Sequence, residues 1–270
     1  MSDHTEDVGC RHAERLLEKA NVVGVAGGDD RVLVFVTEKQ PLTVLAADDV
    51  VDREVDGVRT DVIEVGVLEP MLDAGASIGI TGRGTGTAGG VVADEFGDLY
   101  ALTNNHVAAD SNRARGGTEI VAPGPADGNG RRVGSLARFE PLTFDRANRV
   151  DAALVRLDQD AQPTHPPRTA TARTGWAVSK TGRTTGYTEG EVTGRAATVD
   201  VNFGTLGVVR FVGQLVTTKM LEPGDSGSVL TSRGGYPVGL AFAGSARASI
   251  HTPINLVLRT LAVRFPEATT

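Results

Sequence analysis

The sequence predicts a mostly β protein of antiparallel barrels or a sandwich, preceded by a small α+β module. The 270 residues include 34 glycines together with many valines and threonines, which favour turns and strands. From residue 76 onward, short apolar runs alternate with turn residues, a spacing typical of antiparallel barrels or sandwiches. Only residues 11–20 and the C-terminal end have a helical composition.

Residues 1–75 are expected to form the small α+β module. The stretch RHAERLLEKA (11–20) predicts a short charged helix. The runs NVVGVAGG (21–28) and RVLVFVTEK (31–39) are joined by a Gly-Gly-Asp-Asp turn, which predicts a hairpin, and RTDVIEVGVL (59–68) predicts a further strand. No motif here indicates chemistry, so the module is expected to cap a groove, to bind a regulator or to support a homo-oligomer.

The chain ends in a segment with apolar residues at helical spacing, PINLVLRTLAVRF (253–265). The proline at its start suits the beginning of a helix. We therefore expect a C-terminal helix over residues 254–265 that packs on the β domain.

Composition and charge exclude several classes of partner. The net charge is −7 and the basic residues are scattered, so we expect no nucleic acid partner. Cys10 is the single cysteine, which rules out an intrachain disulfide and a metal site built from several thiolates. The N-terminus lacks the apolar region of a signal peptide, and no run reaches the length of a membrane span. These features predict a cytoplasmic protein with no membrane partner and no cofactor.

A glycine-rich stretch, GTGTAG (84–89), fits the G-x-G-x-x-G pattern of dinucleotide sites. That pattern must open a helix to bind a pyrophosphate, whereas the residues that follow here read as a strand. We therefore do not expect a dinucleotide site.

The strongest chemical signal is the serine in EPGDSGSVL (222–230), because a serine nucleophile needs a nearby base and a group that orients the base. His106 follows the apolar run LYALTNNH where a loop begins, a position that can aim an imidazole into a cleft. Asp151 heads the strand-like run DAALVRL, and Asp145 is the alternative orienting residue. The order His106, Asp151, Ser226 is one of the known chain orders of the catalytic triad.

Three motifs carry a family resemblance. TAGGVVADEFGDLYALTNNHVAAD (87–110) resembles the first-barrel strand and histidine loop of the high-temperature-requirement serine proteases. GRTTGYTEGEVTGRAATVDVNFG (182–204) resembles the start of the second barrel in α-lytic protease and the streptogrisins, and EPGDSGSVL resembles their nucleophile loop. The resemblance covers residues 76–262. It implies a chymotrypsin-like double six-stranded antiparallel β-barrel, with barrels at about 76–165 and 166–255.

The resemblance also implies a function, that of a serine endopeptidase acting on peptide or protein substrates through an acyl-enzyme. Ser226 would be the nucleophile and His106 the general acid and base, while Asp151 would fix the histidine tautomer and stabilise the imidazolium. The backbone N–H groups of Gly224 and Ser226 would form the oxyanion hole.

A buried ion pair is expected beside the nucleophile. In α-lytic protease and the streptogrisins, the aspartate before the serine finds a cationic partner early in the second barrel. The corresponding residues here are Asp225 and Lys180. Those enzymes carry a disulfide where this chain has Ser179 and Glu189, which agrees with a reducing compartment.

The substrate groove is expected along residues 242–244, whose strand edge would pair with an extended peptide. Ala243, Gly244 and the stretch around His251 would form walls of the primary pocket, and His251 would allow a preference for glutamate. No acidic residue is placed at the pocket base, so a preference for Lys or Arg is not expected. Phe242 stands where the family has a serine that contacts the catalytic aspartate, a departure that weakens the case for full catalytic strength.

Two alternatives remain open from the sequence. The chain could be a catalytically weak or inactive protease-fold module that binds extended peptide or a partner protein, which the phenylalanine at 242 favours. Alternatively, a working site could act only in self-cleavage between the two domains.

Overall fold

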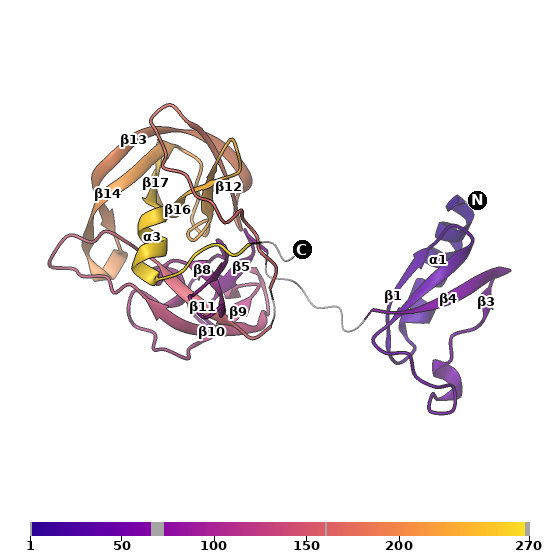
Figure 1. The fold of residues 1–270 in the computed structure, drawn as a ribbon. Coiled ribbons are helices and arrows are strands. Elements are labelled where there is room, and N and C mark those ends of the chain that lie inside the picture. Colours follow the sequence, from indigo (N-terminus) through magenta and orange to yellow (C-terminus); the bar gives the residue numbers. More distant parts are fainter. Residues whose placement is uncertain (1, 66–72, 160, 268–270) are drawn as a thin grey trace. The chain divides into compact units, whose positions relative to one another are not determined.

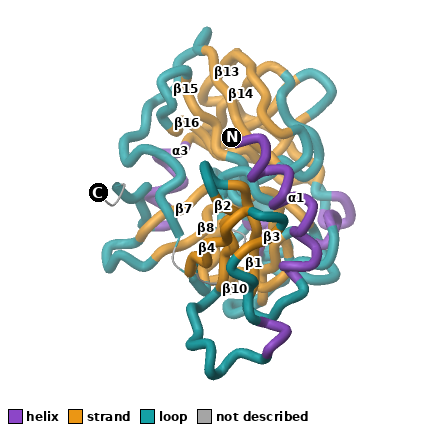
Figure 2. Tube along the Cα trace, turned by 90° about the vertical axis from the view of Figure 1, so that its right-hand side faces the viewer, coloured by secondary structure: helices purple, strands orange, loops and turns teal. Residues whose placement is uncertain are grey.

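A computed structural model describes residues 2–65, 73–159 and 161–267. The chain divides into two compact units, Met1–Pro70 and Met71–Thr270. Gly75 and Ala76 already exchange backbone hydrogen bonds with Ala88, so Gly75 belongs to the second unit and not to the module that was expected to extend to residue 75. Figure 2 shows that strands are the main regular structure, joined by long loops, with short helical segments. Among the described residues, no helix is both long and apolar enough to cross a lipid bilayer.

The first unit packs one helix on a four-stranded sheet of order β1-β2-β4-β3. Its elements are α1 (Ser2–Leu17), β1 (Val22–Gly27), β2 (Arg31–Val36), the short 3-10 helix η1 (Ala47–Asp49), β3 (Glu54–Val55) and β4 (Val58–Glu64). The expected hairpin is present as the antiparallel pair β1 and β2. The strand expected at 59–68 is β4, which runs parallel to β2, and residues 66–68 lie outside the described residues.

The expected start of the first helix was wrong, because α1 begins nine residues before residue 11. The early turns are helical because Val8 and Leu16, eight residues apart on one face, are both fully buried in the core of this unit. Gly9 also brings the helix close to the sheet, since a Cβ there would lie 3.3 Å from the backbone nitrogen of Gly27. Because residues 2–10 are mostly charged or polar, the sequence pattern does not indicate this buried face of the helix.

The second unit opens with a barrel-like sheet of order β6-β5-β9-β10-β11-β8-β7. The strands are β5 (Ser77–Gly79), β6 (Thr85–Thr87), β7 (Gly90–Ala93), β8 (Leu99–Thr103), β9 (Glu119–Ala122), β10 (Arg131–Phe139) and β11 (Ala153–Leu157), with the short helices α2 (Asn105–Ala108) and η2 (Pro125–Asp127). The two ends of this sheet, β6 and β7, are halves of one segment, 85–93. Seven labelled strands therefore correspond to six barrel strands around an apolar interior.

The other six strands form a closed antiparallel barrel of order β12-β13-β14-β17-β16-β15. They are β12 (Ala177–Gly182), β13 (Gly186–Asn202), β14 (Val208–Thr218), β15 (Val229–Ser232), β16 (Pro237–Gly244) and β17 (Ala248–Pro253), with the short helix η3 (Gly204–Leu206) between β13 and β14. The predicted fold, two six-stranded antiparallel barrels, is thus confirmed. β13 and β14 form a long hairpin whose tip lies beyond the barrel wall (Figure 1).

The C-terminal helix α3 (Ile254–Leu261) packs where the two barrels meet (Figure 1). Its apolar face joins a core that also contains Leu102 and Leu154 from the first barrel and Leu240 from the second. The helix is four residues shorter than expected. Its end is fixed by Ala262, which is left-handed with φ 50°, and by the backbone bridge that Arg264 makes with Ala93 in β7.

Candidate active site

The register of two neighbouring strands brings His106 and Asp151 together. β8 pairs with β11 so that Thr103 lies opposite Ala153. His106 follows Thr103 by three residues, on the single turn of α2, and Asp151 precedes Ala153 by two. The His106 Nδ1 atom lies 2.6 Å from Asp151 Oδ2, and the His106 backbone N–H donates to Asp151 Oδ1 at 3.3 Å. Two contacts therefore fix the imidazole ring relative to the carboxylate.

Asp151 is fully buried, whereas the His106 side chain is 24% exposed. The backbone carbonyl of Asp151 accepts a hydrogen bond from the buried Asn104 amide at 2.7 Å, which anchors the residue. The alternative orienting residue, Asp145, is exposed in the loop before β11 and makes no contact with the imidazole among the described residues. Of the two aspartates, only Asp151 can orient the histidine.

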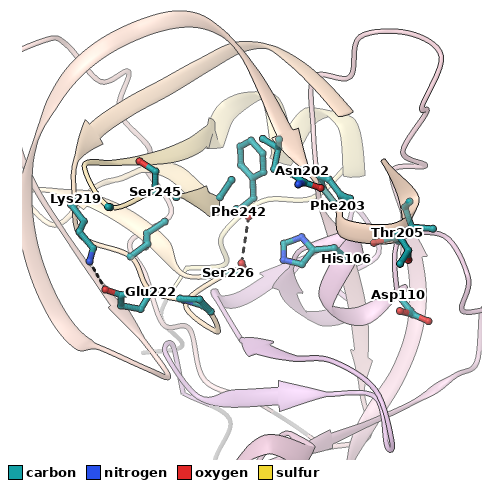
Figure 3. A pocket seen from close by; sticks show the side chains of 18 of the residues that line it. His106, Asp110, Asn202, Phe203, Thr205, Lys219, Glu222, Ser226, Phe242 and Ser245 are labelled. Atoms are coloured by element: carbon teal, nitrogen blue, oxygen red, sulfur yellow. Dashed lines mark hydrogen bonds and ion pairs between the residues drawn. The ribbon is translucent and has the colours of Figure 1, made fainter. Parts of the chain in front are cut away.

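Ser226 lines the same cavity as His106, in the turn three residues before β15 of the second barrel. Figure 3 shows the His106 ring directed toward the Ser226 side chain. The Ser226 hydroxyl donates to the Phe242 carbonyl oxygen at 3.4 Å, and within the described residues no hydrogen bond joins it to His106. The serine–histidine hydrogen bond that would activate the hydroxyl is therefore not formed in this conformation.

Two backbone N–H groups of the turn that carries Ser226 could bind an oxyanion. Among the backbone hydrogen bonds of the described residues, the N–H groups of Gly224 and Ser226 donate to no protein acceptor. Gly224 has φ +102°, which favours glycine, and a Cβ at this position would lie 2.5 Å from the Arg183 guanidinium. The turn thus leaves two unpaired N–H groups near the serine, which is the composition of an oxyanion hole.

The structure brings Lys180 and Asp225 together inside the second barrel. Their side chains are fully buried, and Lys180 Nζ lies 3.2 Å from Asp225 Oδ2. Asp225 also accepts hydrogen bonds from the backbone N–H groups of Glu222, Thr184 and Thr185 and from the Thr185 hydroxyl. Burial alone would raise the pKa of Asp225, but these donors and the Lys180 charge outweigh it and lower that pKa. Asp225 is therefore held as a carboxylate.

Phe242 provides no hydroxyl to Asp151 and instead joins an aromatic stack. Its ring centroid lies 4.7 Å from that of Phe211, which stacks on Phe203 at 6.2 Å. Phe203 in turn meets His106 edge to face at 6.0 Å. An apolar stack on this side of the histidine replaces the polar contact expected at residue 242.

A cavity of about 720 Å³ contains the site (Figure 3). The expected groove residues Phe242, Ala243 and Gly244 line it, together with Leu221 and Pro223. Its other wall is the tip of the β13–β14 hairpin, including Phe203 and Leu206. This wall was not predicted from the sequence, because no local pattern indicates how far the two strands extend toward His106.

His251 does not line the groove, so its expected role there was wrong. It is fully buried, and its Nε2 atom hydrogen-bonds to the Thr217 hydroxyl at 3.0 Å. Its strand β17 pairs with β14 and β16, opposite Leu215 and Ala241. In this register the histidine side chain belongs to the interior of the second barrel, and burial lowers its pKa to about 3.

One fully buried histidine, His251, and one partly buried histidine, His165, make the fold sensitive to mild acid. Burial lowers the pKa of His251 to about 3 and that of His165 to about 4, whereas both titrate near 6.5 when exposed. Between pH 6.5 and about 4 the unfolded chain binds more protons than the folded chain, so stability falls as the pH falls. We expect a loss of about 1.4 kcal/mol per pH unit for each histidine in this window.

Urea unfolding followed by Trp176 fluorescence, at steps between pH 6.5 and about 4, measures this slope in the second unit, because the chain has a single tryptophan. A His251→Gln variant should show a slope shallower by about 1.4 kcal/mol per pH unit. If the parent and the variant have the same slope, His251 takes up its proton in the folded state and the expectation is wrong.

The chain is similar to known peptidases in sequence and in fold. Residues 84–240 match the family model described as trypsin-like peptidase domain. Over 71 residues the chain is 45% identical to streptogrisin-A of Streptomyces griseus, a match that spans 26% of this chain and only 22% of that protein. A Nocardiopsis protease of solved structure is 23% identical, with a TM-score of 0.54 over 72% of this chain and 98% of its own. A glutamic-acid-specific serine protease that uses a histidine triad in substrate binding is 25% identical, with a TM-score of 0.53 over 72% and 99%.

Proposed function

Because the chain belongs to the trypsin-like peptidase family, we propose that it is a serine endopeptidase that cleaves peptide bonds through an acyl-enzyme. The observation that carries the proposal is the pairing of buried Asp151 with His106 directly beside Ser226. The match to streptogrisin-A covers too little of that protein to transfer its activity, so the site geometry has to support the reaction on its own.

In the first half of the proposed reaction, the Ser226 hydroxyl turns from the Phe242 carbonyl toward His106. The imidazole Nε2 accepts the hydroxyl proton while Oγ attacks the substrate carbonyl carbon. Asp151 stabilises the imidazolium that forms, and the N–H groups of Gly224 and Ser226 bind the oxyanion. His106 then donates the proton to the leaving amine, which gives the acyl-enzyme. A water molecule, activated by the same histidine, releases the acid product.

The substrate side chain next to the cleaved bond is proposed to be uncharged and apolar. Leu221, Pro223, Ala243 and Gly244 line the same cavity as Ser226. The charges of Lys219 and Glu222 at the rim pair with each other. The glutamate preference of the 25% identical protease, which uses a histidine triad, is not proposed here because His251 is buried away from the cavity.

Covalent labelling by a fluorophosphonate, read by intact mass, tests the proposal. We expect one adduct on the parent chain and none on Ser226→Ala or His106→Ala, because the probe reacts with a serine only when a base activates it. Ser111 lines the same cavity, so Ser111→Ala serves as the matched control, which should form the same single adduct as the parent. No adduct on the folded parent would refute the endopeptidase.

The competing function is a peptide-binding module with a weak or inactive site, and Phe242 is the observation that favours it. Such a module would still bind extended peptide along the edge of β16. Binding of unmodified extended peptides without fluorophosphonate labelling of the parent would support this alternative.

A further inference from the structure

The oxyanion donor Gly224 lies in a β-turn formed by Glu222, Pro223, Gly224 and Asp225. The Asp225 N–H donates to the Glu222 carbonyl at 3.0 Å, which closes the turn. Proline at its second position and a glycine with φ +102° at its third are the features of a type II turn.

The central peptide of this turn carries both the Pro223 carbonyl and the Gly224 N–H. In a planar trans peptide these two groups point in opposite directions. Type I and type II turns differ by a rotation of this peptide of about 180°, and the Pro-Gly sequence is compatible with both. A rotated peptide would present a carbonyl oxygen where the N–H is needed, so the oxyanion hole is a two-state element.

One hydroxyl holds the peptide in its observed orientation. Thr184 Oγ1 donates to the Pro223 carbonyl oxygen at 2.8 Å. Thr184 is itself fixed, because its backbone N–H donates to Asp225 Oδ1 at 3.0 Å within the buried ion-pair network. On the other side of the turn, Thr87 Oγ1 donates to the Gly224 carbonyl at 2.8 Å. The two threonines fix successive carbonyls of the turn, and only the Thr184 contact acts on the peptide that contains the Gly224 N–H.

We propose that Thr184 is a positioning residue of the oxyanion hole, which its hydroxyl keeps open by holding the Pro223 carbonyl away from the substrate. The proposal rests on the proposed endopeptidase function, since the oxyanion exists only if Ser226 attacks a carbonyl. It separates the two roles of residue 184: the backbone N–H supports Asp225, and the side-chain hydroxyl sets the orientation of one peptide.

Thr184→Val and Thr184→Ser test this separation, because both keep the backbone contact to Asp225 and only serine keeps the hydroxyl. The readouts are kcat and KM for p-nitrophenyl acetate and the inhibition constant of phenylethylboronic acid, which forms a tetrahedral adduct on the serine. Loss of one oxyanion donor typically costs about 10²–10³ in rate. We expect Thr184→Val to lose about 10-fold to 100-fold in kcat with KM nearly unchanged, and to bind the boronic acid correspondingly more weakly.

Thr184→Ser should retain kcat and boronic acid affinity within about threefold of the parent. Trp176 fluorescence confirms that each variant is folded, and Thr184→Ala replaces the valine variant if that one does not fold. Parent-like kcat in the hydroxyl-free variant, or an equal loss in Thr184→Ser, would overturn the proposal. Failure of the parent to react with a fluorophosphonate would instead refute the endopeptidase, and this inference with it.

Discussion

An Asp151→Asn variant should fold normally and lose about 10⁴-fold in the rate of fluorophosphonate labelling at neutral pH. The carboxylate accepts the Nδ1–H of His106, which leaves Nε2 unprotonated and able to take the serine proton. An asparagine amide can donate to Nδ1, and this places the ring proton on Nε2, where it blocks the transfer. The side chains would keep their positions, but His106 could no longer accept the serine proton.

Asp145→Asn is the matched control for this substitution. Asp145 is exposed in the loop before β11, so its replacement should leave the labelling rate unchanged. The same pair of variants decides between the two aspartates that the sequence left open. Normal labelling of Asp151→Asn, measured as a rate at several probe concentrations, would mean that the Asp151 carboxylate is not needed to orient the base for Ser226.

The family resemblance and the fold class were predictable from the sequence, and the comparisons and the structure confirm both. The reason is that each strand-ending motif carries its own local signal. TNNH follows a strand rich in apolar residues, and the aspartate at 151 precedes another. Antiparallel pairing of two such strands places their adjoining loops side by side at one edge of the sheet.

The tight turn of the glycine-rich nucleophile loop could also be predicted, because Pro223 followed by Gly224 favours a turn with a positive φ at the glycine. The catalytic roles of His106, Asp151 and Ser226 remain predictions, supported by their placement in one cavity. The variants above measure those roles directly.

The position of His251 could not be predicted because β17 has an inverted polarity pattern. Ser249 and His251 are fully buried, whereas Ile250 packs on the other face with the aromatic cluster around Phe211. Alternation of apolar and polar residues normally sets which face of a strand is buried, and a shift of one residue reverses the assignment. In this strand the usual pattern indicates the wrong face.

The wall formed by Phe203 was not predicted for a different reason: the position of the hairpin tip depends on how far β13 and β14 extend from the barrel. β13 is 17 residues long and β14 is 11. The reach of the hairpin depends on where the strands leave the barrel, and that point is set by bulges near Gly194 and Ala197 rather than by the residues of the tip. Local composition predicts the strands without predicting how far they extend.

The buried pair of Lys180 and Asp225 leads to the second large expected effect. Lys180→Met removes the ammonium group and leaves an apolar side chain of similar length in the barrel interior. Breaking a buried ion pair by removing one partner typically costs about 3–5 kcal/mol. Asp225 keeps four other donors in this variant, so we expect a loss near the lower end, about 3 kcal/mol in the free energy of unfolding.

Lys219→Met is the matched control, because Lys219 pairs with Glu222 at the exposed rim of the active-site cavity. An exposed pair of this kind contributes at most about 1 kcal/mol. Urea unfolding followed by Trp176 fluorescence at neutral pH compares the two variants in the second unit. Equal losses for the two lysines would show that the Asp225 carboxylate does not need the buried cation.

The double variant Lys180→Met with Asp225→Asn tests whether the cost comes from the charge left behind. If an unpaired carboxylate is the main penalty, making residue 225 neutral should recover part of the stability lost in Lys180→Met. Labelling of the double variant should nevertheless stay below that of the parent, because the Asp225 carboxylate also accepts the N–H groups of Glu222 and Thr184 that fix the oxyanion turn. An asparagine has one acceptor oxygen and an amide group that would face those N–H donors. Recovery of stability without recovery of labelling would separate the two tasks of this residue: balancing the buried charge and holding the turn.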